Sequence, residues 1–412
     1  MIGVGSLGPL RHTPFRWLVT GRTISMFGGA VAPIALAFTV LDLTGSVRDL
    51  GVVVGARSLA NVAVLVAGGV IADRFPRRLV MMAASTLAAL TQALAAVAVL
   101  TGSATIPLLV ALAVVNGAVS AFSFPASSAL LPQTVPAEVR KQANAINRLG
   151  LSGAMITGAA AGGIMVAVAG PGFGLAFDAA TFAVATVCYA LVRVPDVRDP
   201  GAARRRILTD LREGWIEFAS RTWLWVVVLG FMFLNAVFAG ALLVLGPAVA
   251  DETIGRAAWG LVLAAQTTGA VVGALIALRL RVRRLLLTGV ICMVSELSLL
   301  LGLALAPQVG VLLVAALLTG LGMEVFGVAW ETTVQANVPA DKLARVYSYD
   351  ALGSHLAVPV GQVAAGPAAL AIGVESTLLV GAGAVGLTIA GMITNRDVRH
   401  LEQDLEPATP GG

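Results

Sequence analysis

Long apolar segments separated by short polar breaks fill nearly the whole chain. We predict spans at residues 16–41, 48–72, 78–101, 104–131, 142–169 and 172–194, and then at 222–247, 257–279, 284–306, 308–333, 348–372 and 376–394. Each run is long enough to cross the hydrocarbon core as a helix. The runs are continuous rather than alternating with a period of two, which excludes a transmembrane β-barrel. The pattern predicts an all-α membrane protein of twelve spans, with residues 1–15 as a short tail.

Composition agrees with this pattern. Hydrophobic residues make up 58% of the chain and charged residues only 12%, and the mean hydropathy is +0.91. A water-soluble domain of this length does not bury so much apolar surface. The lipid bilayer is therefore the expected environment.

Basic residues gather in alternate loops and so predict the orientation. Of the 27 Lys and Arg residues, 22 lie on the side of the N-terminus, and only Arg48 and Arg256 lie on the other side. Arg22, Arg57 and Arg148 lie within or at the edge of spans. By the positive-inside rule both termini are cytoplasmic, in the inner membrane of a bacterium. Since the basic residues sit in short loops, the net charge of +5 does not predict nucleic-acid binding.

A polar stretch divides the chain near its middle. Apolar residues recur there at helical spacing opposite charged ones, which predicts an amphipathic helix on the cytoplasmic surface. Its apolar positions are Leu208, Leu211, Trp215 and Phe218. We predict a first half at 1–195, a linker at 196–221, a second half at 222–395 and a tail at 396–412. A tether between halves explains the linker better than DNA binding by its arginine run.

The two halves repeat each other. Gly117 and Gly320 lie 203 positions apart, and so do Gly158 and Gly361. The loop sequence Val135-Pro136-Ala137-Glu138 matches Val338-Pro339-Ala340-Asp341 at the same offset. Two six-helix halves repeated in parallel are therefore expected.

The loop from Gly69 to Arg78 is the densest charge group between two spans. A loop this short makes the flanking helices antiparallel, and Pro76 prevents helix continuation. Asp73 can accept hydrogen bonds at a helix N-terminus, and arginine forks can hold a carboxylate or a helix C-terminus. We predict a conformational latch at this membrane face. Its residues are Gly69, Asp73, Arg74, Arg77 and Arg78.

This loop resembles the one between helices 2 and 3 of the major facilitator superfamily, Gly-x-x-x-Asp-Arg-x-Gly-Arg-Lys/Arg. All five latch residues fall in register, and Pro76 stands in place of the usual glycine. An ordinary basic loop would explain the arginines but not Gly69 and Asp73. The resemblance implies a twelve-helix transporter that works by alternating access.

Further stretches are similar to an exporter branch that includes the enterobactin exporter and macrolide-efflux proteins. They include Leu41-Asp42-Leu43-Thr44-Gly45-Ser46 and Asp178-Ala179-Ala180-Thr181-Phe182. The resemblance implies export of a small organic compound, with protons as the coupling ion. Three positions depart from the pattern. Gly29 replaces an aspartate, Ala113 replaces the arginine of span 4, and Gly158-Ala159 replaces a Gly-Pro pair.

Ionisable side chains inside a bilayer are costly and so are functional candidates. The candidates for proton coupling are Glu324, Asp178 and Glu296. Glu324 follows Gly320 and Gly322, where helix backbones can approach, and an apolar cavity favours the protonated form of a carboxyl group. Structural alternatives stand beside these: Arg22 can reach the interface, and Asp178 can pair within the fold.

The superfamily resemblance also implies that spans 1, 4, 7 and 10 line the substrate cavity. On that basis the candidates for the cavity are Arg22, Arg57, Asn116, Ser120, Asn235 and Glu324. Asp350 and His355, near the start of span 11, are further ionisable candidates.

The sequence has no nucleotide-binding loop, metal-ligand cluster or nucleophile–base pair, so we expect neither an enzyme nor a cofactor. Cys188 and Cys292 lie in apolar segments and are expected to be buried thiols. The expected partners are a small-molecule substrate, protons and lipid, with the chain acting as a monomer. An importer, an uncoupled facilitator or a non-transporting receptor with the same fold are the alternatives.

Overall fold

A computed structural model describes residues 4–72, 76–194, 215–280, 282–339 and 342–402. Within these ranges the chain is almost entirely helical. Eleven helical segments of the described residues are long and apolar enough to cross a membrane. The helix α2 (Val47–Ala72), of 26 residues, brings the number of long helices to the predicted twelve. The prediction of an all-α membrane fold is confirmed.

The first half contains six long helices. They are α1 (Thr13–Thr44), α2, α3 (Arg77–Leu100), α4 (Ile106–Leu130), α5 (Arg140–Ala169) and α6 (Pro171–Leu191). Two short 3-10 helices, η2 (Leu131–Gln133) and η3 (Ala137–Val139), join α4 to α5. Within the predicted tail over residues 1–15, a 3-10 helix, η1 (Val4–Arg11), leads into α1, which begins three residues earlier than the predicted span. Pro14 lies in the first turn of α1, where its missing N–H group leaves no hydrogen bond unmade.

The second half has more interruptions. Its helices are α8 (Thr222–Gly240), α9 (Gly246–Glu252), α10 (Arg256–Ala277), α11 (Leu285–Cys292), α12 (Glu296–Leu305), α13 (Val309–Asn337), α14 (Leu343–Leu356), α15 (Val358–Ile372), α16 (Val374–Thr394) and α17 (Arg396–His400). A π-helical turn, η5 (Ala241–Leu245), joins α8 to α9, and a 3-10 turn, η6 (Met293–Ser295), joins α11 to α12. The span 348–372 begins earlier than predicted and is broken at Ala357, just before Pro359, because proline cannot continue the hydrogen bonding of the preceding turn.

The internal repeat is visible in the helix packing. A Cβ atom on Gly117 of α4 would collide with the carbonyl of Arg57 on α2, and one on Gly320 of α13 would collide with the carbonyl of Gln266 on α10. The same relationship recurs where α5 packs on α1 and α15 packs on α8. Glycines at the same repeat position thus allow equivalent helix pairs to approach closely.

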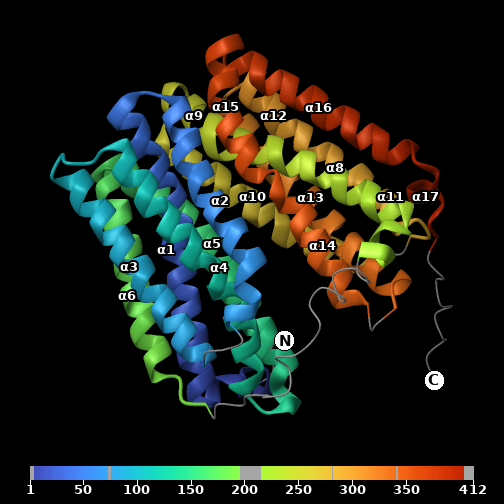
Figure 1. Cartoon of the computed structure of the whole chain (residues 1–412), viewed down its shortest axis with the longest axis horizontal. Coiled ribbons are helices and arrows are strands. Elements are labelled where there is room, and N and C mark those ends of the chain that lie inside the picture. The colour runs from blue at the N-terminus through green and yellow to red at the C-terminus, as the bar shows by residue number, and fades with distance from the viewer. Residues whose placement is uncertain (1–3, 73–75, 195–214, 281, 340–341, 403–412) are drawn as a thin grey trace.

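The two halves meet along two helix pairs, α5 with α10 and α2 with α15. In Figure 1 the blue-to-green and yellow-to-red groups converge near α9 and α15 and diverge toward the labelled N and C ends. A Cβ atom on Gly163 would lie 2.7 Å from the Cα of Gly260. These contacts lie at the helix ends remote from the basic loops, so the halves are closed there and separated at the opposite end.

The end of the linker packs against α14. Residues 215–219 are helical, and the ring centroids of Trp215 and Phe218 lie 5.7 and 5.8 Å from that of Tyr349. Glu217 accepts hydrogen bonds from Lys342 at 2.7 Å and from Arg221 at 2.7 Å. These two cations hold the pKa of the Glu217 carboxyl below its ordinary value, and Lys342 has the larger effect. The rest of the predicted amphipathic helix lies outside the described residues.

Candidate functional site: a cavity between the halves

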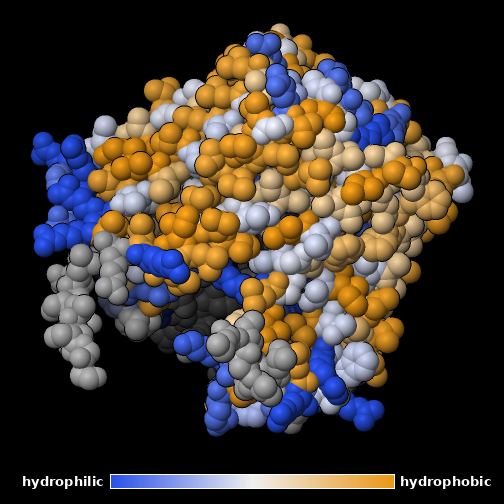
Figure 2. Space-filling model, turned by 180° about the vertical axis from the view of Figure 1, so that it is seen from behind, coloured by the Kyte–Doolittle hydropathy of each residue, from blue (hydrophilic) through white to orange (hydrophobic). Residues whose placement is uncertain are grey.

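A cavity of about 1030 Å³ lies between the two halves. It is lined by α5 of the first half and by α8, α10, α13 and α14 of the second half. Figure 2 shows the molecule hollowed on one side, with hydrophilic residues around the mouth and apolar surface above it. Tyr347 and Glu331 lie in the lining near the start of α14 and the end of α13, on the side of the basic loops. The cavity therefore opens toward the side that carries the basic loops.

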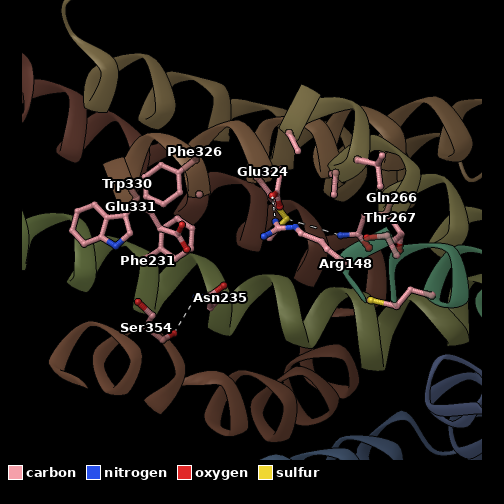
Figure 3. Close-up of a pocket in the computed structure, with 18 of the residues that line it drawn as sticks. Arg148, Phe231, Asn235, Gln266, Thr267, Glu324, Phe326, Trp330, Glu331 and Ser354 are labelled. Carbon is pink, nitrogen blue, oxygen red and sulfur yellow. Dashed lines mark hydrogen bonds and ion pairs between the residues drawn. The ribbon is translucent and has the colours of Figure 1, made fainter. Parts of the chain in front are cut away.

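One ion pair crosses the cavity. Nη2 of Arg148, on α5, donates to Oε1 of Glu324, on α13, at 3.0 Å (Figure 3). The Arg148 side chain is 76% exposed and that of Glu324 is 28% exposed. Glu324 thus lines the cavity as the sequence analysis predicts, and it is paired with a cation from the other half. Sequence reasoning missed this pairing, since Arg148 was interpreted only as a residue at the edge of a span.

Aromatic rings form one wall of the cavity. The ring centroids of Phe231 and Phe326 lie 4.4 Å apart with an interplanar angle of 14°, and those of Phe326 and Trp330 lie 6.2 Å apart at 13°. Phe326 and Trp330 are four residues apart on α13, a spacing that places them on one helix face. Nε1 of Trp330 donates to Oδ2 of Asp350 at 2.9 Å, and Oγ of Ser354 contacts Oδ1 at 3.3 Å. We call Phe231, Phe326 and Trp330 the aromatic wall.

Asn235 lies beside this wall. Its Nδ2 donates to the carbonyl oxygen of Ser354 at 3.0 Å and so joins α8 to α14 (Figure 3). Asn235 and Glu324 are the two members of the predicted substrate set that line this cavity. Asp350 and His355, also singled out from the sequence, line it as well.

Three predicted residues form a separate polar cluster inside the first half. Nε of Arg57 donates to Oδ1 of Asn116 at 3.2 Å, and Nδ2 of Asn116 donates to Oγ1 of Thr91 at 3.3 Å. Nε2 of Gln92 donates to Oδ2 of Asp178 at 2.5 Å, and Asp178 is only 1% exposed. Arg57, Gln92 and Asn116 line a small cavity of about 20 Å³, which is room for about one water molecule.

The remaining candidates from the sequence, Arg22, Ser120 and Glu296, line neither of these two cavities. Arg22, on α1, is half-buried, and its backbone carbonyl accepts a hydrogen bond from Ser25 at 3.1 Å. Ser120 donates to the carbonyl of Asn116 on its own helix at 2.7 Å. Glu296 is 1% exposed, and its Oε2 has no hydrogen-bond partner among the described residues. It begins α12, directly after the 3-10 turn η6.

The predicted latch loop is described in part. Gly69 belongs to the last turn of α2, and Arg77 begins α3. Nε of Arg78 donates to the carbonyl of Tyr189 at 3.2 Å, and its Nη2 donates to the carbonyl of Ala190. These carbonyls lie at the C-terminal end of α6, where a cation is favourable for the helix dipole. Asp73 and Arg74 lie outside the described residues.

The opposite end of the molecule carries a charged cluster that sequence reasoning missed. Nη1 of Arg256, at the start of α10, donates to Oδ2 of Asp42 at 2.9 Å, and its Nε donates to Oδ1 of Asp251 at 2.8 Å. The guanidinium carbon lies 4.8 Å from the ring centroid of Phe38. The available signal in the sequence was that Arg256 is one of only two basic residues in the loops opposite the basic ones. We call Asp42, Asp251 and Arg256 the outer ion cluster.

Comparison with known proteins identifies relatives of this chain. The chain is 26% identical over 388 residues to the multidrug efflux pump Tap of Mycolicibacterium fortuitum, covering 90% of this chain and 92% of Tap. It is 27% identical over 227 residues to an uncharacterized MFS-type transporter of Bacillus subtilis strain 168, YkuC, and this match spans 52% of either chain. The chain thus matches about half the length of YkuC.

Solved structures share the fold. The nucleoside transporter NupG has a TM-score of 0.74 at 12% identity, over 92% of this chain and 98% of NupG. A bacterial homologue of the human lysosomal transporter Spinster, in an inward-facing and unoccupied conformation, has a TM-score of 0.71 at 15% identity, over 94% of this chain and 97% of that protein.

The family described as Transmembrane secretion effector matches residues 4–410, nearly the whole chain. The relatives are transporters, not enzymes, and such proteins move small solutes across the membrane that they span. The chain therefore belongs to the transmembrane secretion effector family of the major facilitator superfamily and is a multi-pass membrane transporter of small solutes.

Proposed function

We propose that this transporter exports small organic compounds from the cytoplasm by alternating access. The observation that carries the proposal is the cavity of about 1030 Å³, open toward the basic loops and closed at the opposite end. With the basic loops placed in the cytoplasm, this is the conformation that loads substrate from inside. The similarity to Tap, a multidrug efflux pump, supports export.

The cavity suits a lipophilic organic molecule. Its volume lies at the upper end of the range for drug-sized ligands, about 300–1,000 Å³. Aliphatic side chains of α10 and the aromatic wall make most of its surface apolar. Drugs, macrolides, siderophores and other natural products of this size are therefore the substrates we expect.

The proton gradient is the proposed source of energy, with Glu324 as the first carrier. Glu324 lies in the cavity and bridges the halves through Arg148. Adding a proton to its carboxylate removes the charge that holds Arg148, so loading a proton and releasing the inter-half contact become one event. Asp178 and Glu296 are the further candidates, because both are carboxyl groups that are 1% exposed.

Two sets of contacts would favour alternate conformations of the halves. The latch loop, with Gly69, Asp73, Arg74, Arg77 and Arg78, would act at the cytoplasmic side, where Arg78 donates to the end of α6 within the first half. The outer ion cluster would act at the other side. In this proposal the halves, 1–195 and 222–395, move about the linker, and the protein works as a monomeric antiporter with both termini in the cytoplasm.

Cellular accumulation tests export and its energy source together. A bacterial host lacking its own pumps would express the protein, Glu324→Gln or, as a matched control, Glu375→Gln, which changes an exposed carboxylate at the start of α16. The intracellular accumulation of neutral lipophilic compounds and of macrolides would be measured with and without a protonophore. We expect lower accumulation that the protonophore and Glu324→Gln both abolish and that Glu375→Gln retains. Unchanged proton-dependent efflux in Glu324→Gln would exclude Glu324 as the carrier.

Import or facilitated diffusion is the second candidate. NupG, which shares the fold, is a nucleoside transporter. In the same cells, higher accumulation in the presence of the protein would indicate import, and equilibration unaffected by the protonophore would indicate a facilitator. Binding of substrate without any flux would favour a receptor.

A further inference from the structure

We infer that one end of the cavity is a subsite for an organic cation that carries an aromatic group. The subsite consists of the carboxylates of Glu331 and Asp350 together with the aromatic wall. This inference rests on the proposed function, because it takes the cavity to be where substrate binds, and it adds the charge and shape of the substrate.

The charges that line the cavity are unequally distributed. Its carboxylates are Glu324, Glu331 and Asp350, and its cationic side chains are Arg148 and the ionisable His355. Arg148 is already paired with Glu324 at 3.0 Å. Among the described residues, Glu331 forms no ion pair. The acidic excess therefore lies at the end of the cavity near Glu331.

Asp350 is held in place by neutral donors. It accepts from Nε1 of Trp330 at 2.9 Å and contacts Oγ of Ser354 at 3.3 Å, and His355 lies near enough to interact electrostatically. The indole and hydroxyl donors fix the carboxylate without neutralising it. The same hydrogen bond also fixes the ring of Trp330, so the anion and the aromatic surface are positioned together. A preorganised site of this kind loses little freedom when a ligand binds.

The aromatic wall offers a surface suited to a cation. Phe326 and Trp330 are almost fully buried, whereas Phe231 is only half-buried and retains free ring area. Aromatic faces attract cations and stack with other rings. Glu331 follows Trp330 directly and lies two helical turns after Glu324, so both carboxylates are on the cavity side of α13 (Figure 3). The hydroxyl of Tyr347, also in the lining, has no hydrogen-bond partner among the described residues.

An anionic substrate is the competing possibility, since Arg148 is well exposed. Nη2 of its guanidinium, however, already donates to Glu324, so a ligand anion bound by Arg148 would lie beside that carboxylate. The same anion would also meet the two other carboxylates of the lining, Glu331 and Asp350. The distribution of charge thus favours cations over anions.

Two ions of the same shape and opposite charge test this directly. Tetraphenylphosphonium and tetraphenylborate each carry four phenyl rings, and their binding to the purified full-length protein would be measured by equilibrium dialysis against protein-free micelles. We expect the phosphonium to bind more tightly than the borate by about ten-fold or more. Glu331→Gln should weaken phosphonium binding by about five-fold and leave borate binding unchanged or stronger. Glu375→Gln, remote from the cavity, should change neither.

Equal or tighter binding of the borate, or no binding of the phosphonium, would overturn the inference. An equal loss of both ions in Glu331→Gln would also overturn it, because it would show a change of shape rather than of charge. Asp350→Asn keeps the acceptor for Trp330 and should repeat the result for Glu331→Gln. Efflux of neutral compounds in cells separates this inference from the proposed function. If the cells export neutral compounds but the purified protein does not bind the phosphonium, the subsite is excluded and export stands. If the protein binds the phosphonium selectively but the cells show no efflux, export is excluded and the subsite stands.

Discussion

Arg256, at the start of α10, donates two hydrogen bonds to the carboxylate of Asp42, in the last turn of α1, and so joins the two halves of the molecule. The pair lies where the halves already meet through Gly163 and Gly260. The side chains of Arg256 and Asp42 are 23% and 43% exposed. At such exposure an ion pair contributes only about 1 kcal/mol. A contact of this strength can bias a conformational equilibrium without locking it.

Removing the charge of Asp42 should loosen the outer side. For Asp42→Asn we expect a shift of about 1 kcal/mol, or about five-fold, toward the outward-open conformation. Hydrogen exchange of the amides in the second turn of α10 and the last turn of α1 should become faster by a similar factor. Glu375→Gln, also on the outer side but outside the outer ion cluster, is the control. Equal exchange in Asp42→Asn and the unchanged protein would show that the cluster does not hold the outer side closed.

The contact between Gly163 and Gly260 should not tolerate a side chain. A Cβ atom on Gly163 would lie 2.8 Å from the carbonyl oxygen of Arg256, a backbone atom that cannot move aside cheaply. Gly163→Leu should therefore prevent closure of the outer side and abolish transport while the protein still inserts in the membrane. The measurement is the efflux rate at matched protein level.

Gly153→Leu is the control for that substitution. Gly153 lies on the same helix, α5, and a Cβ atom there would meet nothing within 4 Å. We expect it to keep most of the activity. If both leucine variants lost transport equally, the loss would reflect damage to α5 rather than to the contact between the halves.

The ion pairs of Glu217 predict a stability that depends on pH. Because Lys342 and Arg221 lower the pKa of this carboxyl in the folded protein, its contribution is complete above the unfolded pKa, about 4.3 for glutamate. It is lost as the pH falls through the lower folded value. The melting temperature of the purified protein should exceed that of Glu217→Gln at pH 7, and the difference should shrink toward zero as the pH falls below about 4. A difference that stays constant or grows in acid would contradict this account.

The buried carboxylate of Asp178 should matter more for its hydrogen bonds than for its volume. Asp178→Ala removes the acceptor for Gln92, whose amide is only partly buried, and should cost about 1 kcal/mol. Asp178→Asn retains an acceptor at that position and should cost less. Thermal unfolding in detergent would rank the two variants. If Asp178→Asn were no more stable than Asp178→Ala, the charge beside Arg57, which both variants remove, would be the dominant contribution.

Several features of the fold follow from local sequence alone. Span length and loop charge are local properties, and they predicted the helices. The repeated glycine positions predicted that the second half repeats the first. The breaks in the second half were missed. A π-turn such as η5 has no simple compositional marker, whereas Pro359 could have predicted the break at Ala357.

The site was less predictable, because its contacts join residues far apart in the chain. Asn235 and Glu324 do line the cavity, but Arg57 and Asn116 lie in the polar cluster of the first half instead. A single sequence does not show that Arg148 meets Glu324, since 176 residues separate them. Glu331 carried a readable signal, because it repeats the position of Glu324 two turns later on the same helix.

The π-helical turn Ala241–Leu245 sets the rotational phase between the two ends of its span. A turn of this kind holds one residue more than an α-helical turn, and one residue corresponds to about 100° of rotation. If the same residues were wound as an α-helix, with none deleted, α9 would swing by about that angle around the axis of α8. Asp251 would then face away from Arg256, although every side chain of the outer ion cluster would still be present. The pairing of charges at one surface of the protein thus depends on how an apolar helix inside it is wound.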